Sequence, residues 1–210
     1  MIAIIDYGAG NLQSVVKAMN YIGCKCEITK DINTILNADG AILPGVGSFE
    51  DAMNCMTSCS ADKAVKEFVA TGKPFLGICL GLQLLFPASE ESPNAQGLSI
   101  LEGTVTKIPN NNGTLKIPHM GWNSLNIKKN DGLFKGIEGN PYVYFVHSYF
   151  LKATNPEIVS SQTEYGTTID ASVSYKNIMA TQFHPEKSGK VGLQILKNFA
   201  DMTDRKEVLL

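Results

Sequence analysis

The first hundred residues alternate between two hydrophobic patterns. Short, mostly apolar runs at residues 2–5, 40–43 and 74–78 are typical of buried strands, and residues 26–29 suggest a further strand. Between them, apolar side chains recur at helical spacing over residues 49–56 and 62–70, and earlier at Leu12, Val15, Val16, Met19 and Ile22. Asn11 is suited to cap that earlier helix and Gly23 to end it. The alternation predicts a parallel sheet wrapped by helices.

The pattern changes from about residue 98 onward. Apolar stretches separated by turn residues predict strands over residues 105–108, 115–117, 124–127, 142–150, 158–161 and 171–175. A buried strand over residues 178–183 and a closing helix over residues 191–202 follow. The prediction is an α/β fold with a mixed, mostly parallel central sheet flanked by helices and an antiparallel addition in the second half. We expect a single domain over residues 1–210.

Composition narrows the class of protein. The chain has 210 residues, of which 44% are hydrophobic and 18% charged, with a net charge of −2. These values fit one globular domain with a sizeable core, and they give no support for a nucleic-acid or membrane surface. The N-terminus lacks the basic and apolar regions of a signal peptide, so we expect a cytoplasmic protein. Four of the five cysteines are interpreted as plain thiols, because no second ligand pair at zinc spacing accompanies Cys24, Cys26, Cys55 and Cys59.

Cys79 carries the most informative local pattern. It follows the apolar run at residues 74–78 and lies between Gly77 and Gly81. A nucleophile flanked by glycines at positions −2 and +2, between a strand and a helix, is the pattern of a nucleophile elbow. Residues 82–86 are predicted to start that helix, whose N-terminus favours a thiolate. The sequence therefore predicts an enzyme with a cysteine nucleophile.

A general base and an oxyanion site can be sought in the same way. Among the three histidines, His184 precedes Glu186 by two positions after a predicted strand, so both side chains are expected on one side. A carboxylate beside an imidazole orients it, as a catalytic triad requires. His119 and His147 are interpreted as ordinary surface or core residues. The glycine-rich residues 44–49 are either an ordinary turn or a set of N–H groups aimed at an oxyanion, and their place after a predicted strand favours the second reading.

These motifs resemble those of the class I (triad) glutamine amidotransferases, which hydrolyse glutamine and pass ammonia to a partner. Residues 77–83 and the His184-x-Glu186 pair carry this resemblance, which spans nearly the whole chain. A narrower resemblance, to the glutaminase subunits of imidazole glycerol phosphate synthases in histidine biosynthesis, rests on residues 6–12, 44–49, 118–123 and 144–149. The resemblance implies a flavodoxin-like core and neither a metal nor another cofactor.

The resemblance also implies a role for individual residues. The catalytic residues would be Cys79, which attacks the glutamine amide, His184, which transfers protons, and Glu186, which holds His184. Backbone N–H groups for the oxyanion would come from Val46, Gly47 and Leu80. L-glutamine would be recognised by Gln83, Glu91, Ser148 and Tyr149. A (β/α)8-barrel cyclase subunit, which completes a heterodimer and receives the ammonia, would contact Asn11, Trp122, Tyr144 and Lys187.

Small departures from the family pattern leave alternatives open. Leu82 replaces a usual methionine, Ser99 a usual glycine, and Pro87 follows the elbow segment closely. A paralogue that supplies ammonia to a different synthase, such as an enzyme that modifies a surface sugar, would fit the same sequence. A non-catalytic scaffold of the same fold is disfavoured by the intact Cys79, His184 and Glu186.

Overall fold

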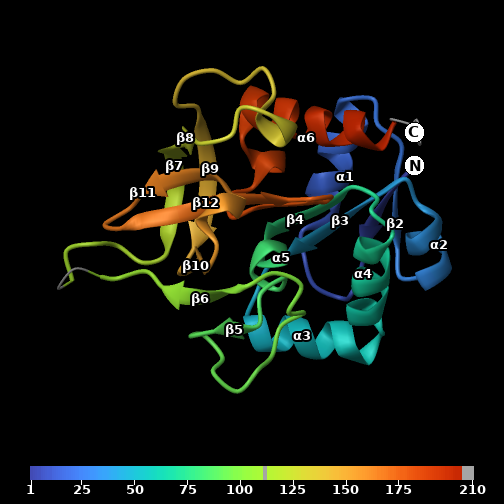
Figure 1. The fold of residues 1–210 in the computed structure, drawn as a ribbon, viewed down its shortest axis with the longest axis horizontal. Helices are drawn as coiled ribbons and strands as arrows, with labels where there is room; N and C mark the ends of the chain where they lie inside the picture. The colour runs from blue at the N-terminus through green and yellow to red at the C-terminus, as the bar shows by residue number, and fades with distance from the viewer. Residues whose placement is uncertain (111–112, 205–210) are drawn as a thin grey trace.

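A parallel core of five strands combines four strands from the first half of the chain with one from near its end. The computed structural model describes residues 1–110 and 113–204. The core strands lie side by side in the order β2 (Cys26–Thr29), β1 (Ile2–Ile5), β3 (Gly40–Gly45), β4 (Phe75–Cys79) and β13 (Ile178–Thr181). Figure 1 labels β2, β3 and β4 among them. Each neighbouring pair is parallel. This is the flavodoxin-like order, which confirms the predicted core.

Helices cover both faces of this core because its strands are apolar on both sides. Along β1, Ile2 and Ile4 pack on one face, and Ala3 and Ile5 on the other. The Ile2 face is covered by α1 (Leu12–Tyr21) and α6 (Gly189–Thr203). The Ala3 face is covered by α2 (Ile32–Asn37), α3 (Phe49–Ser58) and α4 (Ala61–Ala70). Continuous apolar runs are therefore the correct signal for these strands.

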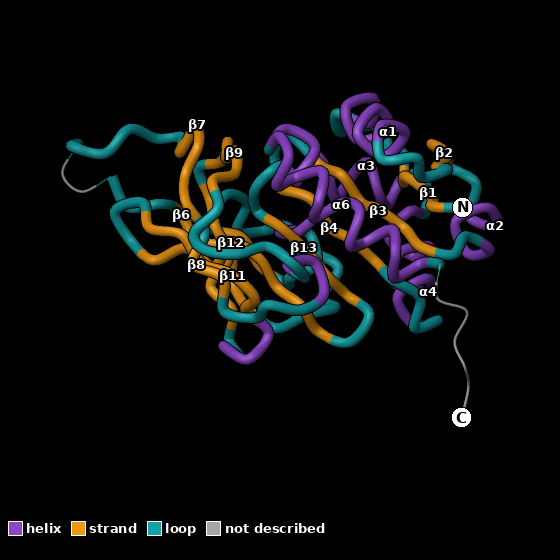
Figure 2. The backbone as a smooth tube through the Cα atoms, turned by 90° about the horizontal axis from the view of Figure 1, so that it is seen from above, coloured by secondary structure: helices purple, strands orange, loops and turns teal. Residues whose placement is uncertain are grey.

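The second half extends the sheet with mainly antiparallel strands. Beyond β13 follow β12 (Thr168–Tyr175), β10 (Tyr149–Ala153), β6 (Gly103–Lys107) and the short β5 (Ala88–Ser89), while β11 (Val159–Glu164) and β8 (Asn126–Ile127) branch from β12. A separate antiparallel pair is formed by β7 (His119–Ser124) and β9 (Tyr142–His147). Figure 2 shows this strand-rich part beside the helix-rich core. Short 3-10 helices connect the strands at η1 (Gly132–Phe134), η2 (Pro156–Ile158) and η3 (Pro185–Lys187).

Several predicted elements of the second half are wrong. The predicted strand at residues 115–117 is a bend without strand pairing, and the Leu115 N–H donates to the Asn110 carbonyl at 3.1 Å. The strand there is β7, which begins only after Pro118. The predicted strand at residues 142–150 is two strands, because the chain leaves β7 and joins β6 at Ser148. Tertiary pairing, which local hydrophobicity does not encode, decides these boundaries.

The elbow helix is also shorter than predicted. It is α5 (Leu80–Gln83), a single turn that begins before the predicted residues 82–86. Its continuation is blocked because the carbonyl of Leu84 accepts the Leu98 N–H at 2.8 Å, and the carbonyl of Leu85 accepts that of Ile100 at 2.9 Å. A helix would need these carbonyls for its own ladder.

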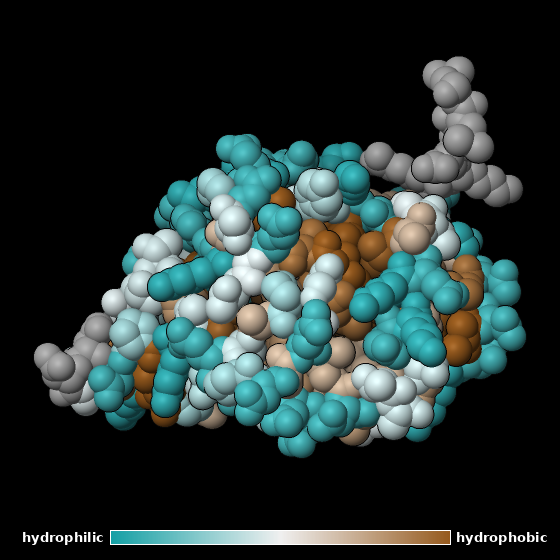
Figure 3. All heavy atoms as spheres, turned by 60° about the horizontal axis from the view of Figure 1, so that its bottom comes forward, coloured by the Kyte–Doolittle hydropathy of each residue, from teal (hydrophilic) through white to brown (hydrophobic). Residues whose placement is uncertain are grey.

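The surface of the described residues is mixed in character. Figure 3 shows one face of the molecule, where hydrophilic side chains surround a hydrophobic area near the middle. Within residues 1–110 and 113–204, no helix has both the length and the apolar character needed to cross a membrane. The large hydrophobic residues that are most exposed are Tyr21, Met120, Tyr142 and Trp122.

We expect the elbow to depend strictly on Gly81. A Cβ atom at this position would lie 1.9 Å from the carbonyl oxygen of Leu43 in β3, so Gly81→Ala forces two backbone segments apart. The free energy of unfolding, measured by urea denaturation, should fall by about 3 kcal/mol or more. Gly72→Ala is the control, because Gly72 has φ +80 but open space around it, and the loss should be only about 1–2 kcal/mol. Equal losses in the two variants would contradict the close-approach explanation.

Candidate active site

Cys79 lies where β4 meets α5, in the conformation of a nucleophile elbow. Its backbone has φ 55 and ψ −109, an uncommon conformation for a residue with a side chain. The turn requires a glycine at position 77, because a Cβ there would lie 2.7 Å from the carbonyl oxygen of Gly81. Cys79 is 7% exposed and its Sγ lies 3.9 Å from the carbonyl oxygen of Val146. Because α5 has only one turn, few aligned peptide dipoles support a thiolate here, fewer than the predicted longer helix would supply.

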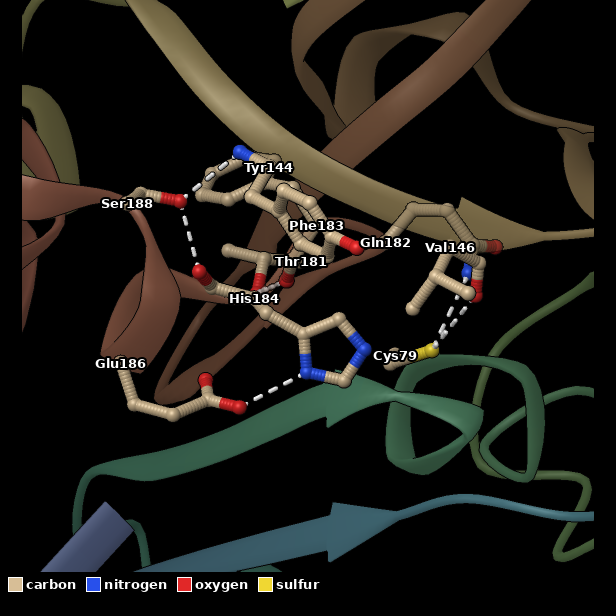
Figure 4. Close-up of polar contacts among 9 residues, drawn as sticks. All are labelled: Cys79, Tyr144, Val146, Thr181, Gln182, Phe183, His184, Glu186 and Ser188. Atoms are coloured by element: carbon tan, nitrogen blue, oxygen red, sulfur yellow. Dashed lines mark hydrogen bonds and ion pairs between the residues drawn. The ribbon is translucent and has the colours of Figure 1, made fainter. Parts of the chain in front are cut away.

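His184 and Glu186 form a buried pair beside this sulfur. His184 follows β13, and its Nδ1 lies 2.7 Å from Oε1 of Glu186 (Figure 4). Both side chains are almost completely buried. The other ring nitrogen, Nε2, has no hydrogen-bond partner among the described residues and faces Cys79 in Figure 4. Burial lowers the pKa of His184, but the nearby Cys79 and Glu186 outweigh it and raise this pKa to about 9.

A cavity of about 330 Å³ joins the separate sequence motifs. It is lined by Cys79 and His184, by all three residues expected to hold an oxyanion and by all four expected to bind substrate, and also by Pro118, Val146 and His147. Glu186 is not part of the lining and supports His184 instead. The described residues contain no group of three or more His, Cys, Asp or Glu side chains that could hold a metal ion.

The two backbone segments expected to hold an oxyanion meet at the edge of the sheet. Gly45, the last residue of β3, is the register partner of Cys79 in β4. The chain continues into Val46 and Gly47, whose φ of +104 suits glycine. Leu80 is the first residue of α5, so no carbonyl within that helix accepts its N–H. N–H groups from two segments can therefore be directed toward an atom bound at the sulfur.

Two oxygen acceptors lie on another side of the cavity. Gln83 uses its amide nitrogen twice, donating to the carbonyl of Tyr149 at 2.9 Å and to Oε1 of Gln182 at 3.0 Å. Its own Oε1 is therefore the group left for a ligand. Glu91 accepts the N–H of Phe49 at 2.8 Å through Oε2, which ties its carboxylate to the start of α3. A carboxylate and an amide oxygen together suit an ammonium group.

The Ser148–Tyr149 segment has less freedom than the sequence suggests. The Ser148 carbonyl accepts the Ile108 N–H at 2.9 Å, and the Tyr149 carbonyl accepts from both Gln83 and His147. Both carbonyls are thus engaged within the protein. What this segment can offer a ligand is N–H groups and side-chain hydroxyls.

Sequence patterns missed a histidine pair at this site. His147 and His119 are directly opposite in the β7–β9 register, and His119 Nδ1 lies 3.0 Å from His147 Nε2. His147 lines the cavity and holds the Tyr149 carbonyl through Nδ1 at 2.9 Å. Burial lowers the pKa of His147 to about 3 and that of His119 to about 4, so both rings are neutral near pH 7. His119 and His147 are thus buried and hydrogen-bonded, as ordinary core histidines are, but their pairing and the place of His147 in the cavity lining follow only from the register of two distant strands.

The residues expected to contact a partner gather outside the cavity. Trp122 and Tyr144 are register partners on β7 and β9, with ring centroids 6.2 Å apart. The Nζ of Lys187 lies 6.0 Å from the centroid of the Tyr144 ring. Asn11 is exposed at the start of α1, and this helix contacts η3, which ends at Lys187. Trp122 is 56% exposed, an unusual position for a tryptophan without a partner.

Comparison with known proteins identifies the family. The profile of the glutamine amidotransferase class-I family matches residues 3–202. Imidazole glycerol phosphate synthase subunit HisH from Caldanaerobacter subterraneus is 50% identical over 202 residues, which cover 96% of this chain and 98% of the relative. The protein of the same name from Methanosarcina acetivorans is 50% identical over 203 residues, which cover 96% of this chain and 98% of the relative.

Solved structures support the fold independently. A structure of PurLQS from Thermotoga maritima has a TM-score of 0.72 at 18% identity, and the match covers 95% of this chain and 97% of that chain. A solved glutamine amidotransferase has a TM-score of 0.74 at 17% identity, with coverage of 97% and 99%. At such identities the likeness concerns the fold alone, and it confirms the predicted mixed α/β architecture. The chain therefore belongs to the class-I glutamine amidotransferase family, and within that family to the group of HisH subunits.

Proposed function

We propose that this chain is the glutaminase subunit of an imidazole glycerol phosphate synthase, hydrolysing L-glutamine to glutamate and ammonia. The observation that carries the proposal is one cavity lined by the strained Cys79, by His184, which Glu186 holds through Nδ1, and by acceptors for an ammonium group. The names and near-complete coverage of the relatives support the identity of the larger enzyme.

The reaction would proceed through a covalent thioester. The proton of the Cys79 thiol passes to Nε2 of His184, and the Sγ attacks the carboxamide carbon of glutamine, whose carbonyl oxygen takes the negative charge. N–H groups of Val46, Gly47 and Leu80 stabilise that oxyanion. Protonated His184 gives its Nε2 proton to the amide nitrogen, which leaves as ammonia. Neutral His184 then removes a proton from water, which attacks the thioester and releases glutamate and the Cys79 sulfur.

The substrate would be held by its α-ammonium and α-carboxylate groups. Glu91 and the free Oε1 of Gln83 accept from the α-ammonium group. N–H groups or hydroxyls of Ser148 and Tyr149 bind the other polar groups, because the carbonyls of that segment are engaged. Fixing both ends of glutamine presents its side-chain amide to Cys79 in one orientation.

The ammonia would pass to a (β/α)8-barrel synthase subunit bound on the β7–β9 face. Met120 and Trp122 are exposed on β7, and their register partners on β9 are Val146 and Tyr144. Val146 also lines the cavity, so this face is continuous with the site where ammonia is released. A partner seated here would close the cavity mouth and receive the product directly.

Replacing the nucleophile should separate the two halves of the reaction. In a complex with the synthase subunit, Cys79→Ala should lower glutamine-dependent product formation by about 10⁴-fold or more, since the attacking atom is absent. Ammonium-dependent product formation by the same complex should stay within about twofold, because the synthase site is untouched. Both rates can be measured by following the synthase product. Retained glutamine turnover in this variant would exclude Cys79 as the nucleophile.

The His184–Glu186 pair predicts a defined pH dependence of stability. A histidine pKa raised above its unfolded value of 6.5 to about 9 adds stability that is complete below pH 6.5 and is lost as the pH rises through 9. The free energy of unfolding should therefore fall by roughly 2–3 kcal/mol between pH 6.5 and 9. In Glu186→Gln this fall should be clearly smaller, because the carboxylate no longer raises the pKa of His184.

Urea denaturation at several pH values in that window measures the effect. Glu138→Gln, which changes an exposed carboxylate, should keep the pH dependence of the original chain. The lowered pKa values of His119 and His147 act only below pH 6.5, so they do not mask the result. Identical slopes in the chain and in Glu186→Gln would refute the ion-pair explanation.

The exposed face should behave as a binding surface. Trp122→Ala is expected to weaken the synthase complex by about 10- to 100-fold in Kd, because a large aromatic residue near the centre of an interface contributes roughly 1.5–3 kcal/mol. Isothermal titration calorimetry with the purified synthase subunit measures this change. Tyr175→Ala is the control, since Tyr175 is 42% exposed at the other end of the sheet, beside the start of β13. A Kd that changes equally in the two variants would place the interface elsewhere.

A further inference from the structure

A buried glutamine donates directly to the nucleophilic sulfur. Gln182 has no exposed surface and lies in the two-residue segment between β13 and His184. Its Nε2 donates to the Sγ of Cys79 over 3.7 Å (Figure 4). Within residues 1–110 and 113–204, Gln182 is the residue whose side chain donates a hydrogen bond to this sulfur. None of the sequence motifs marks this residue, although it precedes His184 by only two positions.

The hydrogen-bond network fixes which end of this amide faces the sulfur. The amide nitrogen of Gln83 lies 2.9 Å from the Tyr149 carbonyl and 3.0 Å from Oε1 of Gln182. Because an amide nitrogen carries only donors, the oxygen of Gln182 must be the atom that faces Gln83. The NH₂ group of Gln182 is then the one that faces Cys79. The opposite orientation would set two NH₂ groups against each other and leave an oxygen against the sulfur.

The far end of this network is held firmly. The Tyr149 carbonyl accepts from Gln83 and also from His147, whose Nε2 is in turn paired with His119. The backbone of Gln182 is fixed as well, since its N–H bonds the Ala171 carbonyl at 2.8 Å. The donor is therefore already oriented before any substrate binds, and little conformational entropy is lost when the sulfur becomes charged.

We propose that Gln182 is a catalytic residue that stabilises the thiolate of Cys79 and aims its sulfur at the cavity, with Gln83 holding the Gln182 amide in place. The proposal rests on Cys79 acting as the nucleophile of the proposed function. On ionisation the sulfur loses its own proton, and with it the 3.9 Å contact to the Val146 carbonyl, which accepts only from a thiol. The bond from Gln182 strengthens at the same time, because a donor binds an anion more tightly than a neutral sulfur.

A neutral donor is needed here because other support for the thiolate is limited. The one-turn α5 supplies few aligned dipoles, and His184 carries the only positive charge that the described part of the cavity lining offers. His184 loses that charge when it protonates the leaving ammonia. Gln182 keeps its donor throughout, so it can stabilise the sulfur again when the thioester is hydrolysed.

The test is the pH dependence of Cys79 alkylation in the full-length chain. Iodoacetamide reacts with the thiolate, and mass spectrometry of the peptide containing Cys79 gives the rate at each pH. In Gln182→Met, which keeps the volume and removes the donor, the midpoint should rise by about one pH unit, and alkylation at pH values below the midpoint should slow about tenfold. In Gln182→Glu the midpoint should rise further, because a carboxylate replaces the donor.

Controls are available within the chain. Cys24, Cys26, Cys55 and Cys59 are partly exposed and distant in sequence from Gln182, and their alkylation rates in the same sample should not change. Gln162→Met removes another glutamine amide, one that donates to Asp170 at 2.9 Å outside the cavity, and should leave the Cys79 midpoint unchanged. Thermal unfolding of each variant shows that it is folded.

An unchanged Cys79 midpoint in folded Gln182→Met would overturn the proposal. If that variant does not fold, Gln83→Met decides, since it frees the Gln182 amide to rotate. It should raise the midpoint in the same direction by a smaller amount, and no change would again overturn the proposal. Alkylation does not require glutamine turnover. A midpoint that shifts in Gln182→Met, while the original chain shows no glutamine turnover in the synthase complex, would therefore contradict the proposed function alone. Normal turnover by the original chain, with an unchanged midpoint in Gln182→Met, would contradict only the role of Gln182.

Discussion

The close approach of β3 to the elbow is the constraint on which the site depends. No side chain fits between Gly81 and the carbonyl of Leu43, and a Cβ at Gly45 would lie 2.8 Å from the Cβ of Leu80. Because these backbones touch, the residues after β3 reach the same point as the sulfur of Cys79. A wider separation would leave an elbow and a glycine-rich loop that no longer share one cavity.

From this junction, a network of hydrogen bonds extends away from the elbow and fixes the orientations of the side chains in it. The Tyr149 carbonyl receives two donors, from Gln83 and His147, and through them it is linked to the nucleophile on one side and to His119 on the other. Each donor in this series has a defined acceptor, so the amide and imidazole orientations determine one another. The antiparallel strands of the second half, which supply Tyr149 on β10 and His147 on β9, are therefore part of the site and more than an extension of the core.

The sequence predicts those features of the structure that interactions between neighbouring residues determine. The apolar runs of β1, β3 and β4 and the flanking glycines of Cys79 follow from burial on two faces and from a tight turn, and both can be inferred from neighbouring residues. The one-turn length of α5 cannot be inferred in this way, since the N–H groups of Leu98 and Ile100 from a later loop donate to the carbonyls that would extend the helix.

The residues of the candidate site likewise fall into two groups, those that the sequence predicts and those that only the fold brings together. His184 and Glu186 are two positions apart and could be paired from the sequence, whereas His119 and His147 are 28 positions apart and meet only through the register of β7 and β9. Gln182 was equally hidden, because nothing in the sequence distinguishes a glutamine that packs on a sulfur from one that packs elsewhere. Residues that act through long-range contacts need the fold before their chemistry can be seen.

The cavity lining includes two imidazoles, those of His147 and His184, whose pKa values are shifted in opposite directions, and this difference explains their roles. Burial lowers the pKa of both, but His184 has the Glu186 carboxylate and the sulfur of Cys79 beside it, so its pKa rises to about 9. His147 has a backbone carbonyl, which favours its protonated form, but burial and the neighbouring His119 and His184 outweigh it and lower its pKa to about 3. Environments that push two like groups apart commonly separate a proton carrier from a neutral hydrogen-bonding group. His184 is thus suited to move protons, and His147 to hold Tyr149 without competing for them.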